Sequence, residues 1–260
     1  MKRALTGRTI LVTRPADQAA SLVRELERRG ARVLVAPTIR LVPARSAALT
    51  AALKELAAGR FAWIVLTSAT TVAVLRERLA AGDVRAKVAA IGEGTAETYR
   101  RWTRRGPDLV PETFTTAALA RAFPRGAGRV LTARADIAPA GLEDGLAGKG
   151  WEPTRVDAYR TVFESSLPRA ARDALREAEV DAVTFTSAST VEGFVRARGP
   201  EAIARPTRPP KVIALGPVTA AAARRAGLRP AAVARPHTLD GLVEAVERAL
   251  ARPRRTASST

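Results

Sequence analysis

Short apolar runs alternate with helix-like segments along the chain. Residues 8–15, RTILVTRP, form an apolar run with β-branched residues that stops at Arg-Pro, which predicts a strand followed by a turn. Residues 18–30 carry apolar side chains at helical spacing and end in glycine, the pattern of an amphipathic helix with a glycine C-cap. The apolar run at residues 32–37 predicts a second strand. A strand, a helix and a strand in this order indicate a parallel pair of strands.

The alternation continues into the middle of the chain. Residues 38–43 lie between two prolines, and we expect them to stay extended. Beyond them, the pattern predicts strands at residues 61–68, 87–91 and 107–110 and helices at residues 46–59, 69–82 and 115–123.

The second half of the chain repeats the first. Residues 128–150 parallel residues 8–30, and the later strand ends and turns follow at nearly the same spacing. A duplication of this length, with alternating strands and helices, predicts two α/β domains of like fold, and by itself it places one boundary near Gly126. Five strand–helix steps per half favour a flavodoxin-like, doubly wound parallel sheet in each. The corresponding positions are Arg14 and Arg134, Ile39 and Tyr159, Ser68 and Ser187, and Thr95 and Thr219.

Four strand ends carry the polar sequences TSATT, IGEGT, TSAST and LGPVT. Ligands of doubly wound sheets bind beyond the carboxyl ends of the strands, so these ends line one cleft if the two halves face each other. The turns at residues 90–96 and 214–220 lead into helices whose N-terminal amides attract anions. The sequence has no Walker A pattern, and Gly92 and Gly94 lack the third glycine of a dinucleotide fingerprint, which makes phosphate the less favoured anion.

The types of residue present limit the chemistry. The 260 residues include no cysteine and one histidine, which excludes disulfides and thiolate chemistry and disfavours a metal site. His237 is interpreted either as a loop residue near a helix N-cap or as a catalytic base, and no partner pattern surrounds it. We expect no metal and no cofactor. Hydroxyl groups, backbone amides and arginines remain, and an enzyme that relies on them would act by positioning a reactive substrate.

The formal net charge of +18 comes mostly from arginine spread over the whole chain. It has three interpretations: a solvated basic surface, a basic cleft for a polyanionic small molecule, or a nucleic-acid interface. Aromatic residues make up 4% of the chain, and no zinc-finger, RNA-recognition or basic-zipper pattern is present, which disfavours nucleic acid. We see no signal peptide and no run of membrane-spanning length, so we expect a cytoplasmic protein without membrane contact. Residues 251–260 are basic and polar and are expected to be disordered.

The chain has two tyrosines, and they differ in context. Tyr99 lies one turn into the helix after IGEGT, where a partly buried structural position is the better interpretation. Tyr159 lies in the extended stretch at residues 156–163. It is either an aromatic side chain that covers the sheet edge or a phenol at the domain junction that gives a proton or a hydrogen bond into the cleft. The residues alone leave both interpretations open.

Further motifs connect these features to a known family. They are VTRP at Val12–Pro15, the strand ends TSAT and TSAS, IGEGTA, AYRT at Ala158–Thr161, LGPVTA, and T-x-x-G-L at Thr238–Leu242. In this order, and without cysteine, they resemble uroporphyrinogen-III synthase of tetrapyrrole biosynthesis over residues 8–250. The resemblance implies two flavodoxin-like domains joined by a two-stranded antiparallel connector, with the first strand–helix unit packed in the C-terminal half.

The implied boundaries therefore differ from those of the duplication. One domain would consist of residues 1–37 plus 163–260 and the other of residues 42–157. The connector strands would be residues 38–41 and 158–162, which accounts for the extended character of both stretches.

The resemblance also implies a reaction. Hydroxymethylbilane, a linear tetrapyrrole and polycarboxylate, would lose water and close to uroporphyrinogen III with inversion of its last pyrrole ring through a spiro intermediate. Such a substrate suits a basic interdomain cleft, and the reaction needs no cofactor or metal. We expect a monomer that does not bind nucleic acid. The alternative function is a non-catalytic two-domain module that binds a polyanionic ligand or nucleic acid.

Site residues follow from the resemblance by motif. Tyr159 matches the family tyrosine that assists loss of the hydroxyl group. The candidate substrate-binding residues are Thr219 and Gly216 of the Gly-Pro-x-Thr turn, the strand-end Ser187 and, as weaker matches, Ser68, Thr95 and Arg14. The chain departs from the family where Thr71 and Thr190 follow the two strand-end motifs, because members often have Asn-Gly or similar there. If those two positions contact substrate, the binding details differ from the family's.

Overall fold

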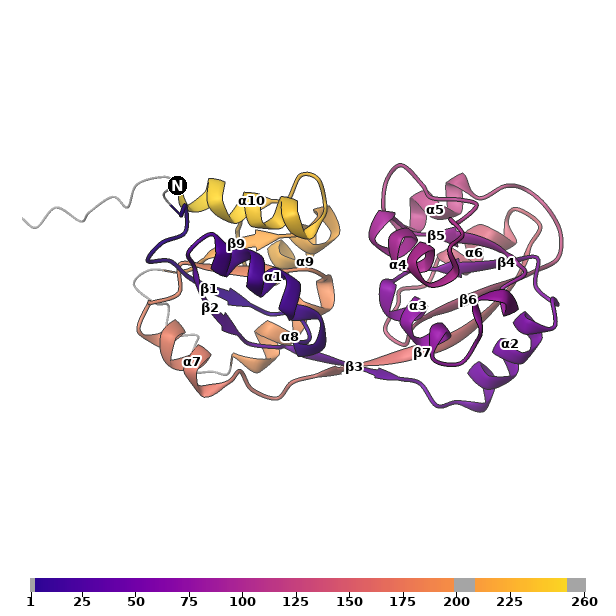
Figure 1. Cartoon of the computed structure of the whole chain (residues 1–260), viewed down its shortest axis with the longest axis horizontal. Helices are drawn as coiled ribbons and strands as arrows, with labels where there is room; N and C mark the ends of the chain where they lie inside the picture. Colours follow the sequence, from indigo (N-terminus) through magenta and orange to yellow (C-terminus); the bar gives the residue numbers. More distant parts are fainter. Residues whose placement is uncertain (1–2, 199–208, 252–260) are drawn as a thin grey trace, which may run out of the picture. The chain divides into compact units, whose positions relative to one another are not determined.

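The computed structural model of the chain describes residues 3–198 and 209–251 (Figure 1). Residues 252–260, which hold most of the segment predicted to be disordered, lie outside the described residues. Strands and helices alternate along the described ranges, as the apolar pattern predicts. No helix in this part of the chain is long and apolar enough to cross a membrane.

The chain forms two compact units. Unit 1 consists of Met1–Arg40 with Val162–Thr260, and unit 2 consists of Leu41–Thr161. A single boundary near Gly126 is therefore wrong, because that residue lies inside unit 2. The cause is strand pairing across the duplication: β1 (Thr9–Val12) lies parallel to β8 (Ala182–Phe185) from the second half.

Unit 1 contains a five-stranded sheet in the order β10-β9-β8-β1-β2, and its neighbouring strands run parallel. Read from β2 and numbered along the unit, this is the order 2-1-3-4-5 of flavodoxin-like sheets, which confirms the predicted fold class. The further strands are β2 (Arg32–Val35), β9 (Lys211–Ala214) and β10 (Pro230–Val233). The helices are α1 (Ala16–Arg28), α7 (Arg169–Arg176), α8 (Ala188–Ala197), α9 (Pro217–Arg225) and α10 (Leu239–Leu250).

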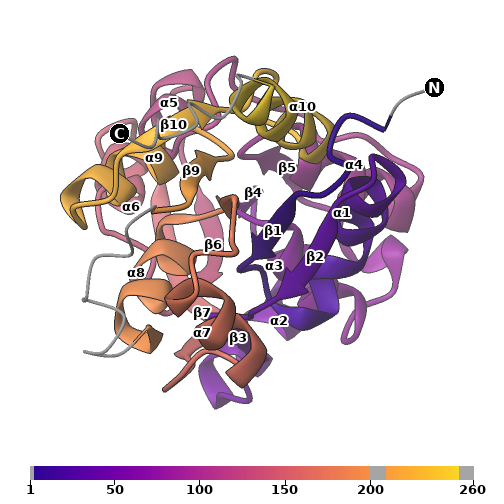
Figure 2. The same ribbon diagram turned by 90° about the vertical axis from the view of Figure 1, so that its left-hand side faces the viewer.

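Helices cover both faces of this sheet, with α1 and α10 on one face and α7, α8 and α9 on the other (Figure 2). Successive strand residues point to opposite faces. Ile10 and Val12 accordingly pack with α1 and α10, whereas Leu11 packs with the helices of the other face. Because the inner strands β1 and β8 are buried on both faces, they are nearly continuous apolar runs instead of alternating ones.

Unit 2 repeats this arrangement with a different entry point of the chain. Its sheet has the order β3-β7-β6-β4-β5, and an isolated parallel bridge from Ala89 to Leu109 stands where a strand at 107–110 was predicted. With β3 left out and the bridged segment at Leu109 taken as the fifth strand, counting from β6 gives the order 2-1-3-4-5 again. The strands are β3 (Ile39–Pro43), β4 (Trp63–Leu66), β5 (Lys87–Ala90), β6 (Arg129–Ala135) and β7 (Glu152–Phe163). The helices are α2 (Ala47–Ala57), α3 (Ala69–Arg76), the short 3-10 helix η1 (Ala81–Asp83), α4 (Glu93–Thr103), α5 (Thr116–Ala122) and α6 (Leu142–Ala147).

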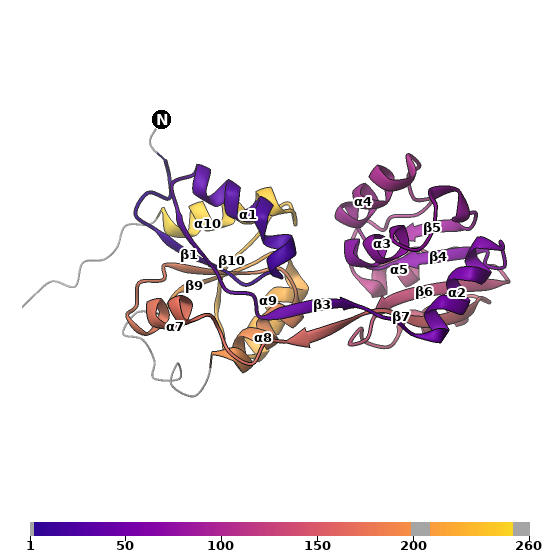
Figure 3. The same ribbon diagram turned by 60° about the horizontal axis from the view of Figure 1, so that its bottom comes forward.

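The strands β3 and β7 run side by side in opposite directions (Figure 3). The Glu164 amide donates to the Thr38 carbonyl at 3.0 Å, and the Ala44 amide donates to the Ala158 carbonyl at 2.9 Å. Residue numbers therefore rise along one strand as they fall along the other, which defines an antiparallel pair. β7 begins well before the expected connector at 158–162, because its first residues pair with β6 in the sheet of unit 2.

Serine and threonine start several of the helices. At each of these N-caps, the side-chain oxygen accepts a hydrogen bond from the backbone amide three residues later, which satisfies one of the unpaired amides of the first turn. These N-caps are Ser46 of α2, Ser68 of α3, Thr115 of α5, Ser187 of α8 and Thr238 of α10. Two of the residues predicted to bind substrate are thus also capping residues.

Candidate active site

In unit 2, the predicted residues lie at the carboxyl edge of the sheet. Ser68 and Thr95 follow the neighbouring parallel strands β4 and β5. Thr95 is the third residue of α4 and is 6% exposed, and no described residue forms a hydrogen bond with its hydroxyl group. Tyr159 lies in β7 and is 8% exposed.

The structure brings Tyr159 and Ser68 together. The Tyr159 phenol donates a hydrogen bond to Ser68 Oγ at 3.1 Å, although the two residues are 91 positions apart in the sequence. Ser68 Oγ also accepts from the Thr71 amide at 3.1 Å and lies 3.1 Å from Thr71 Oγ1. Thr71 Oγ1 in turn donates to the Ala133 carbonyl at 3.2 Å. Three hydroxyl groups therefore form one continuous hydrogen-bonded chain.

The backbone around Tyr159 is held by Asp136. The Asp136 amide donates to the Tyr159 carbonyl at 3.1 Å, and Asp136 Oδ1 accepts from the Thr161 amide at 2.9 Å. The sequence indicates nothing of this role, because Asp136 reaches β7 only through the pairing of β6 with β7. The only sequence feature that points to Asp136 is its position directly after a predicted strand.

The phenol of Tyr159 keeps its proton at neutral pH. Burial raises its pKa, and the hydrogen bond with Ser68, which acts in the opposite direction, does not outweigh burial. The nearby Asp136 carboxylate raises this pKa further, whereas the Arg134 guanidinium lowers it. The side chain thus stays neutral below its ordinary pKa of about 10 and keeps its proton available.

In unit 1, the predicted residues follow three adjacent strands. Arg14 follows β1, Ser187 follows β8, and Gly216 with Thr219 follows β9. Thr219 is the third residue of α9 and is 5% exposed, and no described residue forms a hydrogen bond with its hydroxyl group. A methyl group added at Gly216 would meet nothing closer than His237 Cγ at 3.9 Å, so local packing does not demand glycine there.

The helix N-termini at these strand ends are of two kinds. α3 and α8 are capped by the Ser68 and Ser187 side chains, whereas α4 and α9 begin at Gly92 and Gly216 without a side-chain cap. Backbone amides of the first turn therefore remain free of a side-chain partner in α4 and α9. These two turns are the better anion sites of the four.

The departures from the family at Thr71 and Thr190 have a structural explanation. Both side chains are buried, at 0% and 1% exposure, and both form hydrogen bonds with the capping serine of their own helix. They stabilise the first turn and do not reach solvent. These two positions consequently offer no contact to a substrate.

Arg14 has an incomplete set of partners. Its Nη2 donates to Gln18 Oε1 at 3.3 Å, while its buried Nε has no hydrogen-bond partner among the described residues. Burial lowers the pKa of the guanidinium, against the opposing attraction of Asp17. The group nevertheless stays charged at neutral pH and can bind a carboxylate in a bidentate manner.

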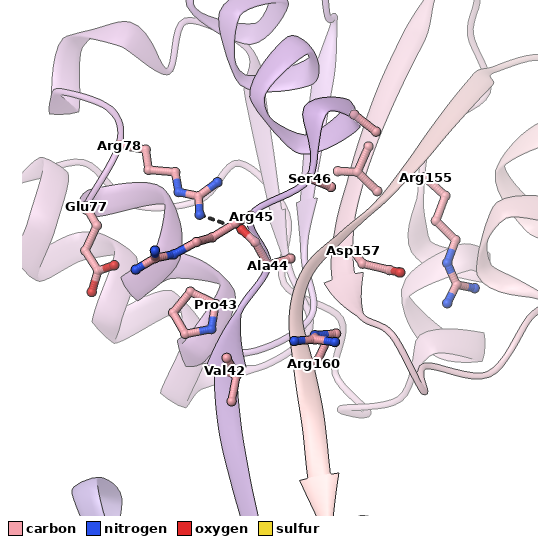
Figure 4. Close-up of a pocket in the computed structure, with 12 residues that line it drawn as sticks. Val42, Pro43, Ala44, Arg45, Ser46, Glu77, Arg78, Arg155, Asp157 and Arg160 are labelled. Carbon is pink, nitrogen blue, oxygen red and sulfur yellow. Dashed lines mark hydrogen bonds between the residues drawn. The ribbon is translucent and has the colours of Figure 1, made fainter.

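A basic pocket of about 1090 Å³ lies in unit 2 (Figure 4). Arg45 and Arg160 have no ion-pair or hydrogen-bond partner among the described residues, whereas Arg78 donates to the Ala44 carbonyl and Arg155 to the Ala138 carbonyl. Sequence reasoning missed this cluster because arginine is spread over the whole chain. None of the predicted site residues lines the pocket. It is lined by Val42, Pro43, Ala44, Arg45, Ser46, Ala48, Glu77, Arg78, Arg155, Val156, Asp157 and Arg160.

His237 lies beside Gly216, the N-cap of α9. The His237 Nδ1 lies 2.7 Å from the Ala234 carbonyl, in the loop before α10, which fits the interpretation as a loop residue near an N-cap. The part of the chain that the structure describes contains no group of three or more histidine, aspartate or glutamate side chains that could hold a metal ion.

Two flavodoxin-like units related by duplication, each with polar residues at its strand ends, define a class of two-domain α/β proteins. Within this class, the chain belongs to the uroporphyrinogen-III synthase family. The family model described as uroporphyrinogen-III synthase HemD matches residues 20–244.

Individual relatives agree with this assignment. The chain is 30% identical over 259 residues to uroporphyrinogen-III synthase of Synechococcus elongatus, covering 95% of this chain and 97% of the relative. It is 27% identical over 247 residues to uroporphyrinogen-III synthase of Chlorobaculum parvum, covering 85% and 91%.

Solved structures show the same fold. A mutant uroporphyrinogen III synthase from the extremely thermophilic bacterium Thermus thermophilus matches with a TM-score of 0.68 and 23% identity, covering 95% of this chain and 100% of that one. Uroporphyrinogen-III synthetase from Helicobacter pylori matches with a TM-score of 0.57 and 18% identity, covering 91% and 97%.

Proposed function

We propose that this chain catalyses the reaction of its family, the dehydrative closure of hydroxymethylbilane to uroporphyrinogen III. The observation that carries the proposal is the neutral, buried Tyr159 phenol, oriented by Ser68 in the unit whose sheet edge also carries Thr95. A neutral phenol can protonate a leaving hydroxyl group, which departs as water when its bond to carbon breaks. The electron pair of the adjacent pyrrole nitrogen compensates for the lost bond, leaving an electrophilic azafulvenium cation that keeps its N–H proton, while the phenolate carries the balancing negative charge.

The later steps depend on positioning. The substituted carbon of the last pyrrole attacks the azafulvene and forms a spiro intermediate, and this ring then fragments and recloses inverted. Uncatalysed closure gives the non-inverted isomer, so the enzyme must favour one geometry over another of similar chemical reactivity. Hydroxyl groups, amides and arginines suffice for this task, because the carbon–carbon bonds that form and break all belong to the substrate.

Substrate recognition follows from the anion sites. The uncapped turns at Gly92 and Gly216 and the Arg14 guanidinium offer N–H groups to carboxylates. We assign Thr219 and Thr95 to the same task, because their hydroxyl groups have no described partner. Ser68 and Ser187 fit it less well, since both serve as helix caps.

One experiment tests the proposed function. The purified protein is incubated with freshly prepared hydroxymethylbilane, and the uroporphyrinogen isomers are resolved after oxidation to the porphyrins. We expect the type III isomer to dominate over the type I isomer that forms in a control without protein. Type I product at the control level would overturn the proposal.

The physiological setting is part of the same proposal. We infer a monomer in the cytoplasm that does not bind nucleic acid. Light scattering after size-exclusion chromatography tests the monomer, and titration with duplex DNA at low and moderate salt tests the alternative of a polyanion-binding module. Salt-sensitive DNA binding by a protein that forms no type III isomer would favour that alternative.

A further inference from the structure

The hydrogen-bond directions in the hydroxyl chain of unit 2 can be assigned without seeing hydrogens. A carbonyl oxygen only accepts, so the Thr71 hydroxyl donates its proton to the Ala133 carbonyl. The proton between Ser68 and Thr71 must then come from Ser68. Ser68 Oγ itself accepts from the Tyr159 phenol and from the Thr71 amide.

These assignments use the full capacity of the Ser68 hydroxyl. A serine side chain has one donor and two acceptor positions, and here all three are occupied by protein groups. A substrate carboxylate needs a donor, which Ser68 can supply only by giving up Thr71. The Tyr159 oxygen already lies 3.1 Å from Ser68 Oγ, so it is the acceptor that this geometry places within reach of that donor.

We propose that Ser68 is a positioning residue, which orients the Tyr159 phenol before the reaction and donates a hydrogen bond to the phenolate formed when Tyr159 gives up its proton. This inference rests on the proposed function of Tyr159 as the proton donor. In the step, the O–H bond of Tyr159 breaks, the leaving hydroxyl group takes the proton and departs as water, and the phenolate keeps the electron pair. The Ser68 hydroxyl then rotates from Thr71 Oγ1 to the phenolate oxygen, while its bond from the Thr71 amide persists.

The duplication supplies a natural contrast. Ser187 occupies the corresponding place in unit 1 and caps α8 in the same way. Among the described residues, its hydroxyl bonds only within its own helix turn, to Ser189 Oγ at 2.9 Å and to Thr190. The position that corresponds to Tyr159 is Ile39, which is buried and has no hydroxyl group. One serine of the pair is thus coupled to a phenol, and the other is a cap alone.

A double-mutant cycle tests the inference. We would measure kcat and KM for Ser68→Ala, for Tyr159→Phe and for the double variant, with Thr115→Ala at the start of α5 as the matched loss of an N-cap in the same unit. We expect Ser68→Ala to lower kcat about tenfold, the effect of one hydrogen bond to a charged group, with KM unchanged within about twofold. In the Tyr159→Phe background, the same substitution should have no further effect on kcat, because its partner hydroxyl is already gone.

Two further variants separate the loss of the Ser68 hydroxyl group from the loss of the N-cap of α3. Ser68→Gly removes the hydroxyl but keeps a good N-cap, so it should match Ser68→Ala in kcat at nearly full stability. Ser68→Thr keeps both the hydroxyl and the cap and should restore kcat to within about threefold of the wild type.

The results that would overturn the role of Ser68 differ from those that would overturn the proposed function. A raised KM with unchanged kcat in Ser68→Ala would identify a substrate ligand and overturn the inference, as would an equal loss of kcat in both Tyr159 backgrounds. An equal loss of kcat in Thr115→Ala would also overturn it. In each case type III product from the wild type would leave the proposed function standing, whereas absence of type III product would remove that function itself.

Discussion

The two copies of the duplicated strand end differ in what surrounds their arginine. In unit 2, Arg134 is 1% exposed, and its Nη1 donates to both oxygens of Glu143 at 3.1 and 2.9 Å. In unit 1, Arg14 has, among the described residues, only the amide oxygen of Gln18, at 3.3 Å. The position that corresponds to Glu143 at the repeat spacing of 120 is Val23. One arginine is therefore neutralised inside its unit, while the other keeps its charge available.

This difference teaches that a duplicated motif does not carry a duplicated role. Glu143 also accepts from the Thr132 hydroxyl at 2.8 Å, so the ion pair in unit 2 belongs to a partly buried network. At the corresponding place, unit 1 packs the partly buried Val23 against its core. The same strand end thus holds an ion pair in one unit and, among the described residues, an arginine hydrogen-bonded only to Gln18 in the other.

Among the variants that test this comparison, Arg134→Met should have the largest effect on stability. It leaves the Glu143 carboxylate without its cation in a largely buried place, and we expect the free energy of unfolding to fall by about 3 kcal/mol. Arg14→Met is the matched control and should lose less than about 1 kcal/mol, since no buried carboxylate depends on it. Urea denaturation of both variants measures this. Equal losses would contradict the division of roles.

Tyr159→Phe removes the proton donor and keeps the ring. We expect kcat to fall about 100-fold, as for loss of a general acid, with a stability loss of about 1 kcal/mol. The control is Tyr99→Phe in α4, whose phenol is buried outside the hydroxyl chain. Its kcat should not change. An unchanged rate in Tyr159→Phe would assign proton donation to another group, such as water.

Arg14→Met should act on substrate binding. One charge-assisted hydrogen bond to a carboxylate is removed, and we expect KM to rise about tenfold with kcat nearly unchanged. Arg172→Met is a suitable control, because Arg172 is an exposed residue of α7 in the same unit. Steady-state kinetics decide the question. If both variants bind substrate like the wild type, Arg14 has no binding role.

For the arginines of the basic pocket in unit 2, we expect a smaller effect on KM. Arg45→Gln combined with Arg160→Gln removes two unpaired, exposed charges, and we expect KM to rise about fivefold at low salt and less at high salt. Arg24→Gln combined with Arg172→Gln is the matched control, because both arginines are exposed in unit 1 and neither has an ion-pair partner among the described residues. Equal effects in the two double variants would show a general loss of charge.

Low pH should remove the stability that the ion pair between Arg134 and Glu143 contributes. Burial alone would raise the pKa of Glu143, but hydrogen bonds from Thr132 and the backbone, with the charge of Arg134, outweigh burial and lower it. A carboxylate with a lowered pKa contributes stability above its ordinary pKa of about 4.3 and loses it as the pH falls through the lowered value. Wild type and Glu143→Gln should therefore differ at neutral pH and converge below about pH 4 in urea denaturation. A gap that stays constant with pH would contradict this.

Much of the fold could be predicted from local patterns. Continuous apolar runs and glycine or proline stops identify strands such as β1 and β4, and the spacing of Leu22 and Leu26 identifies α1. The segment at residues 107–110 forms a single bridge with β5, at Leu109, and not a full strand. Local pattern indicates that such a stretch is extended but does not determine how far it pairs.

The candidate site was predictable only in part. Each predicted residue follows a strand or lies in β7, and turn chemistry near strand ends is a local signal. The partners of Ser68 and Arg134 were not predictable, because Tyr159 and Glu143 reach them through the pairing of β4, β6 and β7 and the packing of α6. Contacts of this kind depend on the strand order, which is not a local property.

The sequence by itself determined that this protein has two duplicated α/β halves whose polar strand ends meet at the carboxyl edges of parallel sheets. Periodicity of apolar residues is sufficient for that, since burial and backbone geometry are set residue by residue. Only the tertiary structure decided that β1 joins the C-terminal half, that Tyr159 donates to Ser68, and that Arg134 is neutralised while Arg14 is not. These outcomes depend on which strands become neighbours, and packing of the whole unit selects that arrangement.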